Sequence, residues 1–224
     1  MDISEFILRE KARGDCYRFL SACFYLPQKE IFLEEGILQN LTKGLNQINP
    51  DVAVISNEME MAFLKYSDED LVVEYSRLFV GPYGLKAPPY GSVYLDKERR
   101  VMGDSTIEVI KIYEEAGLTI SNDFKELPDH IAAELEFMYF LIFKEIEALE
   151  RYELYTAMRY LEMQNKFLKK FLWRWIQPFT EKIKEGTKNK FYHGLSDCVT
   201  NFVNNGHLAE DLPESLTDLM REAK

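Results

Sequence analysis

One long apolar segment with a helical period most constrains what this chain can fold into. After Pro128 and Asp129, apolar residues recur every three or four positions, at Ile131, Leu135, Met138, Ile142, Ile146 and Leu149. Further apolar residues widen this stripe almost all the way round, at Phe137, Phe140, Leu141 and Phe143. Such a helix must be buried, so we expect it at the centre of the fold. Proline lacks an N–H and aspartate can accept from free backbone donors, which predicts the helix start at Pro128-Asp129.

The rest of the chain shows the same helical period, and no alternation typical of strands persists. These patterns predict an all-α fold, a compact bundle of about eight to nine helices. With 224 residues the chain suits a single domain, 1–224, or two small lobes, and it can bury a core without disulfide or metal support. The three cysteines, Cys16, Cys23 and Cys198, are therefore expected to be reduced and buried.

Three local patterns predict where other helices begin or bend. Asp68 is a candidate N-cap for the helix that precedes Gly81. The Ser-x-x-Glu sequence at 105–108 has the spacing of a capping box. One long helix is predicted over 154–185, with a kink at Pro178, because proline removes a backbone hydrogen bond.

Residues 81–104 interrupt the helical pattern with a long loop. The segment holds four of the eleven glycines and three of the eight prolines, and it also contains three tyrosines, at positions 83, 90 and 94. Long loops inside compact domains are uncommon and tend to be functional or disordered. The aromatic content favours an ordered, packed loop, and a loop that merely covers one end of the helices is the alternative.

The charge balance excludes one class of partner. With 27 Lys and Arg against 38 Asp and Glu, the formal net charge is −11, which repels phosphate backbones and favours a basic peptide partner. The first residues lack a basic segment followed by an apolar core, and the longest purely apolar run, 137–143, is too short to span a membrane. We therefore expect a soluble, cytoplasmic protein.

A search for catalytic chemistry leaves one weak candidate. Glu126, His130 and Glu134 are spaced by four residues and could ligate a metal, although Pro128 interrupts the helix between the first two. The paired Glu-x-x-His motifs of a di-iron bundle, a phosphate-binding Gly-rich loop and a Gly-x-Ser-x-Gly elbow are all absent from the sequence. We expect no enzyme and no cofactor. A metal-binding helical enzyme and a helical scaffold or regulator that binds another protein stay open as alternatives.

Several short motifs, taken together, resemble one family. Tyr75-x-x-Leu78-Phe79-x-Gly81-Pro82 is followed by Pro89-x-x-Ser92-x-Tyr94 and then by Asp129-His130-Ile131-x-x-x-Leu135. In this order and spacing, within an acidic helical chain, they resemble the TorD/DmsD/NarJ family of cytoplasmic redox-enzyme maturation chaperones. The resemblance implies a TorD-like bundle, with two lobes at about 1–116 and 128–224 joined by a hinge at 117–127.

The resemblance also implies a function. Such a chaperone binds the twin-arginine leader, or the N-terminus, of a molybdopterin-containing oxidoreductase subunit. It assists cofactor insertion, assembly and proofreading before export, as a monomer or a domain-swapped homodimer. Carried over by motif position, the peptide-binding residues would be Tyr75, Leu78, Phe79, Gly81, Pro82, Pro89, Ser92, Tyr94, Asp129 and His130. Glu134 joins them as a carboxylate near the last motif.

The acidic residues near these motifs suit an arginine-bearing peptide. Guanidinium groups favour carboxylates that match their fork geometry, and the apolar part of a leader needs an apolar groove. Acids lie at 68–70 and 74 before the first motif, and Asp129, Glu134 and Glu136 accompany the last one. We expect some of these carboxylates to meet the leader arginines, with Leu78, Phe79 and Tyr94 lining the apolar part.

Overall fold

The computed structural model describes residues 2–81, 84–119, 125–205, 212–214 and 216–217. Within these segments the fold is all-α, as predicted, and it contains nine α-helices of eight or more residues. The elements, in chain order, are α1 (Ile3–Ala22), α2 (Lys29–Glu34), α3 (Ile37–Ile48), α4 (Pro50–Lys65), α5 (Asp68–Tyr75), the π-helix η1 (Ser76–Val80), α6 (Ser92–Leu95), α7 (Asp104–Glu115), α8 (Ile131–Glu150), α9 (Leu154–Lys170), α10 (Leu172–Gly186) and α11 (Lys190–Asn205).

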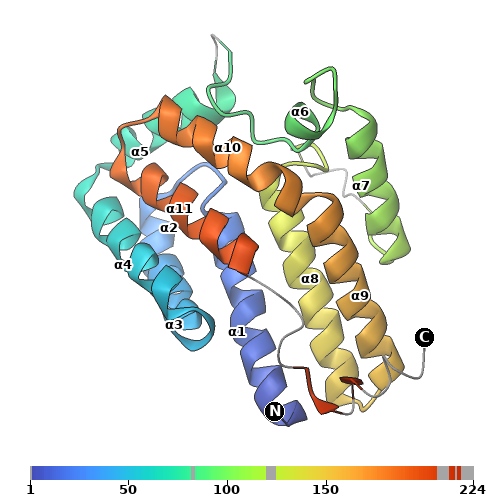
Figure 1. Cartoon of the computed structure of the whole chain (residues 1–224). Helices are drawn as coiled ribbons and strands as arrows, with labels where there is room; N and C mark the ends of the chain where they lie inside the picture. The colour runs from blue at the N-terminus through green and yellow to red at the C-terminus, as the bar shows by residue number, and fades with distance from the viewer. Residues whose placement is uncertain (1, 82–83, 120–124, 206–211, 215, 218–224) are drawn as a thin grey trace.

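Seven of these helices form a closed ring of neighbours. Each packs on the next in the order α8, α1, α3, α4, α11, α10, α9, and α9 returns to α8. In Figure 1, α10 crosses the upper part of the molecule, while α1, α8 and α9 run down from it side by side. Two of these contacts, α1 with α8 and α4 with α11, join the first half of the chain to the second. The predicted hinge at 117–127 includes residues 120–124, which lie outside the described residues.

The central helix is the one that the sequence predicted to be buried. α8 packs between α1 and α9, and its apolar residues face the core on both sides. Aromatic rings fill much of the centre, in a chain of contacts that joins Phe24, Phe79, Phe179 and Tyr192. The three cysteines are free and buried, which confirms their prediction.

The first motif ends on a π-helical turn. The wider turn of η1 is closed by the hydrogen bond from the Gly81 N–H to Ser76 O at 2.7 Å. Gly81 itself has φ +65°, in the left-handed region that favours glycine, and a Cβ there would lie 3.2 Å from Gly84 O. Glycine therefore ends the helix and starts the loop, as predicted.

The single long helix predicted over 154–185 was wrong, because the break lies at Phe171 and not at Pro178. Phe171 has φ −124° and ψ −87°, and its buried ring packs on Phe167 with centroids 5.1 Å apart. Pro178 lies inside α10 on the solvent-exposed side. The carbonyl that loses its partner there is reached by water, so the proline is tolerated.

Two predicted caps were also wrong. Ser67, not Asp68, caps α5, where its hydroxyl accepts from the N–H of Asp70 in a reciprocal capping box. No capping box forms at 105–108, because α7 starts after Gly103, which has no side chain to accept. Asp96 supplies the acceptor from the preceding loop, with 3.0 Å between its Oδ2 and the Ser105 hydroxyl oxygen.

Within the long segment predicted as a loop, residues 87–96 are buried or half-buried and contain the short helix α6, whereas 97–102 are exposed. The segment runs over the end of the molecule at the top of Figure 1, close to the start of α8. No helix among the described residues is both long and apolar enough to cross a lipid bilayer.

Candidate functional site

Backbone hydrogen bonds tie the loop before α6 to the start of α8. The carbonyl oxygen of Pro89 accepts from the first N–H of α8 at 2.8 Å, and the N–H of Gly91 donates to Asp129 O at 2.8 Å. Between these bonds, Tyr90 and His130 form an isolated antiparallel bridge. The second and third sequence motifs therefore form one structural unit.

Asp129 does not cap α8, so this prediction was wrong. Its Oδ2 accepts from the N–H of Ser92 at 2.8 Å, because the carboxylate turns towards the loop. The cap is His130, whose Nδ1 accepts from the N–H of Ala132 at 3.1 Å. Burial lowers the pKa of His130 to about 4. The ring is therefore neutral near pH 7 and keeps the lone pair that the cap requires.

Glu134 is a buried acid without a cation beside it. The indole Nε1 of Trp175 donates to its Oε2 at 2.9 Å, and burial raises the pKa of Glu134 well above its usual range. The side chain is therefore protonated near neutral pH and offers no negative charge to a ligand. Gly91 lies against this pair, since a Cβ at that position would be 3.2 Å from Glu134 Oε1 and from Trp175 Nε1. Only glycine permits this close approach without displacement.

The first motif is joined to this unit through the aromatic core. Tyr75, Leu78 and Phe79 are buried, and the Tyr75 hydroxyl donates to Phe24 O at 3.2 Å. Leu78 O accepts from the N–H of Ala87 at 3.0 Å, which fixes the loop on the motif. Phe179 then packs on both Phe79 and Tyr94, and Tyr94 stacks on Trp175 with centroids 5.7 Å apart.

The structure thus brings the predicted residues together, mostly below the surface. Pro82 lies outside the described residues. Of the other ten, all are buried except Gly81 and Tyr94, which are half-buried. Hydrogen bonds and ring contacts from these buried side chains hold the loop on the helices.

A group of four residues, here called the surface quartet, covers His130 from solvent: Tyr25, Tyr90, Glu126 and Glu136. The Tyr25 ring stacks on the imidazole at 6.3 Å between centroids, and the Tyr90 ring meets it edge-on at 5.4 Å. The Tyr25 hydroxyl donates to Glu136 at 3.0 Å, and the Tyr90 hydroxyl donates to Glu126 at 2.9 Å. Two aromatic faces and two carboxylates therefore meet at one place on the surface.

Sequence reasoning found this quartet only in part. Glu136 was named among the carboxylates, and Glu126 only as a metal ligand. Tyr90 lies inside a recognised motif, between Pro89 and Ser92, so its position was a usable signal. Tyr25 reaches the site from the end of the first helix, and no local pattern indicates that contact.

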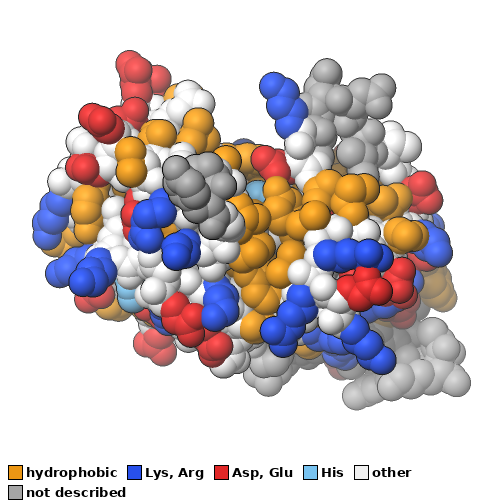
Figure 2. Space-filling view, turned by 90° about the horizontal axis from the view of Figure 1, so that it is seen from above, with side chains coloured by type: hydrophobic (Ala, Val, Ile, Leu, Met, Phe, Trp, Pro, Cys, Tyr) orange, Lys and Arg blue, Asp and Glu red, His pale blue; other side chains and the backbone are white. Residues whose placement is uncertain are grey.

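An apolar surface adjoins the quartet. The loop exposes parts of Leu85, Pro88, Val93 and Leu95, all half-buried. Figure 2, which looks down on this end of the molecule, shows hydrophobic side chains gathered across the middle of the face between two more polar flanks. A peptide with an apolar stretch next to a cation would match such a surface.

The geometry does not favour the metal alternative. The Glu126 carboxylate accepts from Tyr90, the His130 Nδ1 accepts from the α8 backbone, and Glu134 accepts from the indole. Among the residues that the structure describes, no group of His, Cys, Asp or Glu side chains has the arrangement of a metal site.

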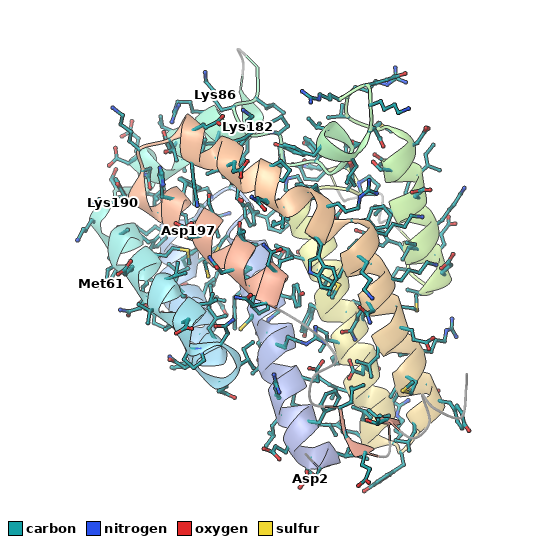
Figure 3. The ribbon with its side chains drawn as sticks, in the orientation of Figure 1. Asp2, Met61, Lys86, Lys182, Lys190 and Asp197 are labelled. Atoms are coloured by element: carbon teal, nitrogen blue, oxygen red, sulfur yellow. The ribbon has the colours of Figure 1, made fainter. Side chains whose placement is uncertain are left out.

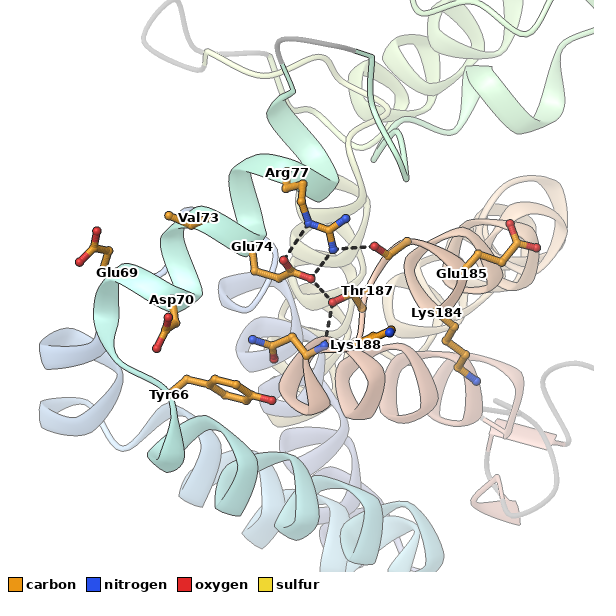
Figure 4. A pocket seen from close by; sticks show the side chains of 12 residues that line it. Tyr66, Glu69, Asp70, Val73, Glu74, Arg77, Lys184, Glu185, Thr187 and Lys188 are labelled. Carbon is orange, nitrogen blue, oxygen red and sulfur yellow. Dashed lines mark hydrogen bonds and ion pairs between the residues drawn. The ribbon is translucent and has the colours of Figure 1, made fainter.

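The acids near the first motif line a second hollow, of about 960 Å³, between α5 and the corner from α10 to α11. Figure 4 shows Glu74 there between Arg77 and Thr187. Burial opposes ionisation of Glu74, but the hydrogen bonds from Arg77, 2.9 Å from its Nε, and from Thr187 lower the pKa. Asp70 is occupied in the capping box with Ser67. Glu74 and Asp70 are therefore bonded to the protein's own donors, whereas Glu69, which also lines the hollow, is exposed.

The family follows from a comparison with known sequences. A profile of the nitrate reductase delta subunit family matches residues 46–181, which include all three motifs. The chain belongs to this family. Its members are chaperones rather than catalysts.

Individual relatives align with this chain over different lengths. Tat proofreading chaperone DmsD of Salmonella typhi is 41% identical over 71 residues, which cover 32% of this chain and 35% of DmsD. The chain thus aligns with about a third of the length of DmsD. Chaperone protein TorD of Aliivibrio salmonicida is 24% identical over 198 residues, covering 85% of this chain and 91% of TorD.

The fold has a solved counterpart. The crystal structure of an Archaeoglobus fulgidus protein named for redox enzyme maturation aligns with a TM-score of 0.54, over 85% of this chain and 93% of that one. At 21% sequence identity, this likeness shows a common fold.

Proposed function

We propose that this protein is a maturation chaperone that binds the twin-arginine leader, or the N-terminus, of a molybdopterin-containing oxidoreductase subunit. In this proposal it acts in the cytoplasm, holds the subunit during cofactor insertion and assembly, and proofreads it before export. Family membership supports the class of function. The surface quartet beside an apolar face is the observation that carries the choice of ligand.

The quartet suits an arginine side chain. Tyr25 and Tyr90 are half-buried, and a guanidinium can stack on the parts of their rings that reach the surface, which gives a cation–π contact, while its N–H groups donate to a carboxylate. Glu126 accepts from Tyr90, and one oxygen of Glu136 accepts from both Tyr25 and Ser21, so the other carboxylate oxygens have acceptor positions open among the described residues. The apolar stretch that follows the arginines would then lie along the exposed parts of Leu85, Pro88 and Val93.

The buried motif residues have a supporting role in this proposal. Asp129 and His130 fix the loop and the helix start, and Glu134 fixes Trp175, which carries the Tyr94 ring. The site is therefore organised before the peptide arrives, and less ordering entropy opposes binding. The overall charge of −11 would raise the rate at which a basic leader associates.

Leader binding to wild type and to two matched double variants tests the proposal. The probe is a synthetic twin-arginine leader with a fluorescent label, and its Kd is measured by anisotropy. We expect Glu126→Gln with Glu136→Gln to raise the Kd about tenfold or more, because two carboxylates leave the guanidinium site. The control, Glu34→Gln with Glu114→Gln, removes the same charge from exposed acids elsewhere.

The same assay tests whether the arginines matter. A leader with Lys-Lys in place of Arg-Arg should bind wild type more weakly, because lysine lacks the planar fork. In the glutamine double variant the two leaders should bind alike. Equal effects of the two double variants, or no measurable leader binding to wild type, would overturn the proposal.

A further inference from the structure

A groove of about 1100 Å³ lies between α4 and α11, and no part of the candidate leader site reaches it. α4 contributes an apolar wall of Ile55, Met59 and Ala62. On α11, Gly194 has no side chain to fill the space, and its Cβ position would lie 3.0 Å from the Met59 Cβ. The two helices therefore meet closely at the floor and leave an open trough along their length.

The apolar surface continues outside the groove. Met61 lines its edge and is 53% exposed, and Val54, two helical turns away on the same side of α4, is 60% exposed. Both side chains lie opposite the face of α4 that packs on the core, which includes Val52 and Phe63. Methionine side chains are flexible and are common at surfaces that adapt to apolar partners.

One end of the groove is cationic, although the chain as a whole is acidic. Lys65, Lys188 and Lys190 line that end and are exposed. Among the described residues, none of these three ammonium groups takes part in an ion pair. Figure 3 shows Lys190 and Met61 along the same edge of the molecule, with Asp197 farther along α11.

The acids of the groove do not neutralise this end. Asp197 is bound to Lys184, and the exposed Glu58 lies on α4 two helical turns before Lys65. Lys188 and Lys190 also flank the N-terminus of α11, where the helix dipole adds to the positive potential. The Tyr66 hydroxyl accepts from the N–H of Lys190 at 3.0 Å, which fixes this corner.

We propose that the α4–α11 groove binds an amphipathic helix of a partner protein, with an apolar stripe and acidic residues at one end. The apolar stripe would lie on Ile55 and Met61, since Met59 beneath them is buried, and the carboxylates would meet Lys65, Lys188 and Lys190. A trough between two helices is the usual receptor for such a helix. This surface lies apart from the surface quartet, so a leader and a helix could be held at the same time.

Designed peptides test the inference without knowledge of the natural partner. The probe is a labelled helical peptide as long as α4, which has 16 residues, with leucine every third or fourth position and glutamates at one end. Its matched control carries lysine in place of glutamate. We expect the acidic peptide to bind about tenfold more tightly than the basic one, and less tightly at high salt. Chemical-shift changes should map to α4 and α11.

Variants of exposed residues locate the contact without disturbing the core. We expect Lys188→Glu with Lys190→Glu to weaken the acidic peptide about tenfold, and Met61→Asp to weaken it to a similar extent. Lys43→Glu with Lys111→Glu is the control, because it makes the same charge change on exposed lysines elsewhere.

Three outcomes would overturn the inference. Equal affinity for the acidic and basic peptides would remove the electrostatic argument. Shift changes confined to the loop at 84–95 would move the binding to the leader site. A wild-type dimer that Met61→Asp converts to a monomer in sedimentation velocity would make the groove an interface between two copies of this chain. Because these readouts do not involve a leader peptide, they do not depend on the leader assay.

Discussion

α8 buries an acid near each of its ends, and the two acids are accommodated in different ways. Near the N-terminus, Glu134 meets the indole of Trp175 and is neutral. Near the C-terminus, Glu145 accepts from Gln164 Nε2 at 2.6 Å, with Arg13 Nη2 4.0 Å away. The first site has one uncharged donor on α10, whereas the second belongs to a charged network between α1, α8 and α9.

The network around Glu145, near the C-terminus of α8, contains more charged groups than the site around Glu134. Burial disfavours the charge of Arg13, but Glu10, whose Oε1 is 3.0 Å from the Arg13 Nε, raises the pKa above its usual value. Burial also raises the pKa of Glu145, and the negative Glu10 adds to the effect. Removal of the cation would leave acids buried without compensation.

The two ends of α8 therefore differ in role: we call the C-terminal end, at the Arg13 network, the fixed end, and the N-terminal end, at Glu134, the presenting end. The Arg13 network joins three long helices and has no exposed surface. The Glu134 end holds a loop whose outer side is exposed, and the candidate leader site lies on that loop. Changes at the first end should therefore affect stability alone, while changes at the second should affect the loop and the surface that it carries.

The largest expected effect is at the fixed end. Arg13→Met should lower the free energy of unfolding by about 3–5 kcal/mol, because it leaves Glu10 and Glu145 without their cation. Urea denaturation at neutral pH measures the change. Arg18→Met on the same helix removes an exposed pair with Asp15 and cation–π contacts with Phe19 and Tyr139, and it should cost about 1–2 kcal/mol. Similar losses for both variants would remove the distinction between the network and a surface pair.

Protonation of His130 should make the presenting end sensitive to acid. The pKa is about 4 in the folded protein against 6.5 for an ordinary histidine. Between these two pH values the unfolded chain binds more protons than the folded protein does. The free energy of unfolding therefore decreases as the pH falls from 6.5 to 4, by about 3 kcal/mol in all. His130→Asn keeps an oxygen to cap α8 and cannot titrate. The unfolding free energies of the two proteins, compared from pH 7 to pH 4, should therefore diverge; parallel curves would contradict the assignment.

Gly91→Ala should disturb the loop at its closest approach to α8. The new methyl group would lie 3.2 Å from both Glu134 Oε1 and Trp175 Nε1, so the loop must move outward. We expect a loss of about 1–3 kcal/mol in thermal or urea unfolding, together with a change in Trp175 fluorescence, recorded with and without Gly91→Ala in a Trp173→Phe background that leaves one tryptophan in the sequence. An unchanged Trp175 signal in Gly91→Ala would show that the loop does not press on this pair.

The last expected effect is a gain in stability. Because the pKa of Glu134 is raised, the folded protein holds a proton that the unfolded chain releases above about pH 4.5. Wild-type stability is therefore lost as the pH rises, and Glu134→Gln, which still accepts from the indole, escapes this loss. We expect the variant to be more stable than wild type at pH 7 and about equal to it at pH 4. A less stable variant at pH 7 would mean that Glu134 is ionised in the fold.

Local sequence signals explain which parts of the fold could be predicted. The periodicity of α8 and the glycine after η1 act within a few residues, so both were found. The end of α9 at Phe171 was missed because it depends on where an aromatic ring packs, and the stronger local signal, Pro178, lies where water offsets its cost. The cap at His130 was missed because Asp129 bonds to Ser92, a partner outside the helix.

Contacts between residues far apart in the sequence limited the prediction of the candidate site even more than that of the fold. The motifs led to Asp129, His130 and Glu134, which the structure brings together, although below the surface. The exposed contacts of Tyr25 join segments that no pattern links. The Arg13 network was missed entirely, since its contact with Gln164 spans 151 positions and neither residue lies in a recognisable motif.

Hydrogen–deuterium exchange with and without a twin-arginine leader tests the central claim most directly. The claim is that the loop fixed to the start of α8 presents the leader-binding surface. It predicts slower exchange on leader binding at 88–95 and 125–136, with no change at the Arg13 network or along α4 and α11. Slower exchange confined to those other regions, with the loop unaffected, would contradict it.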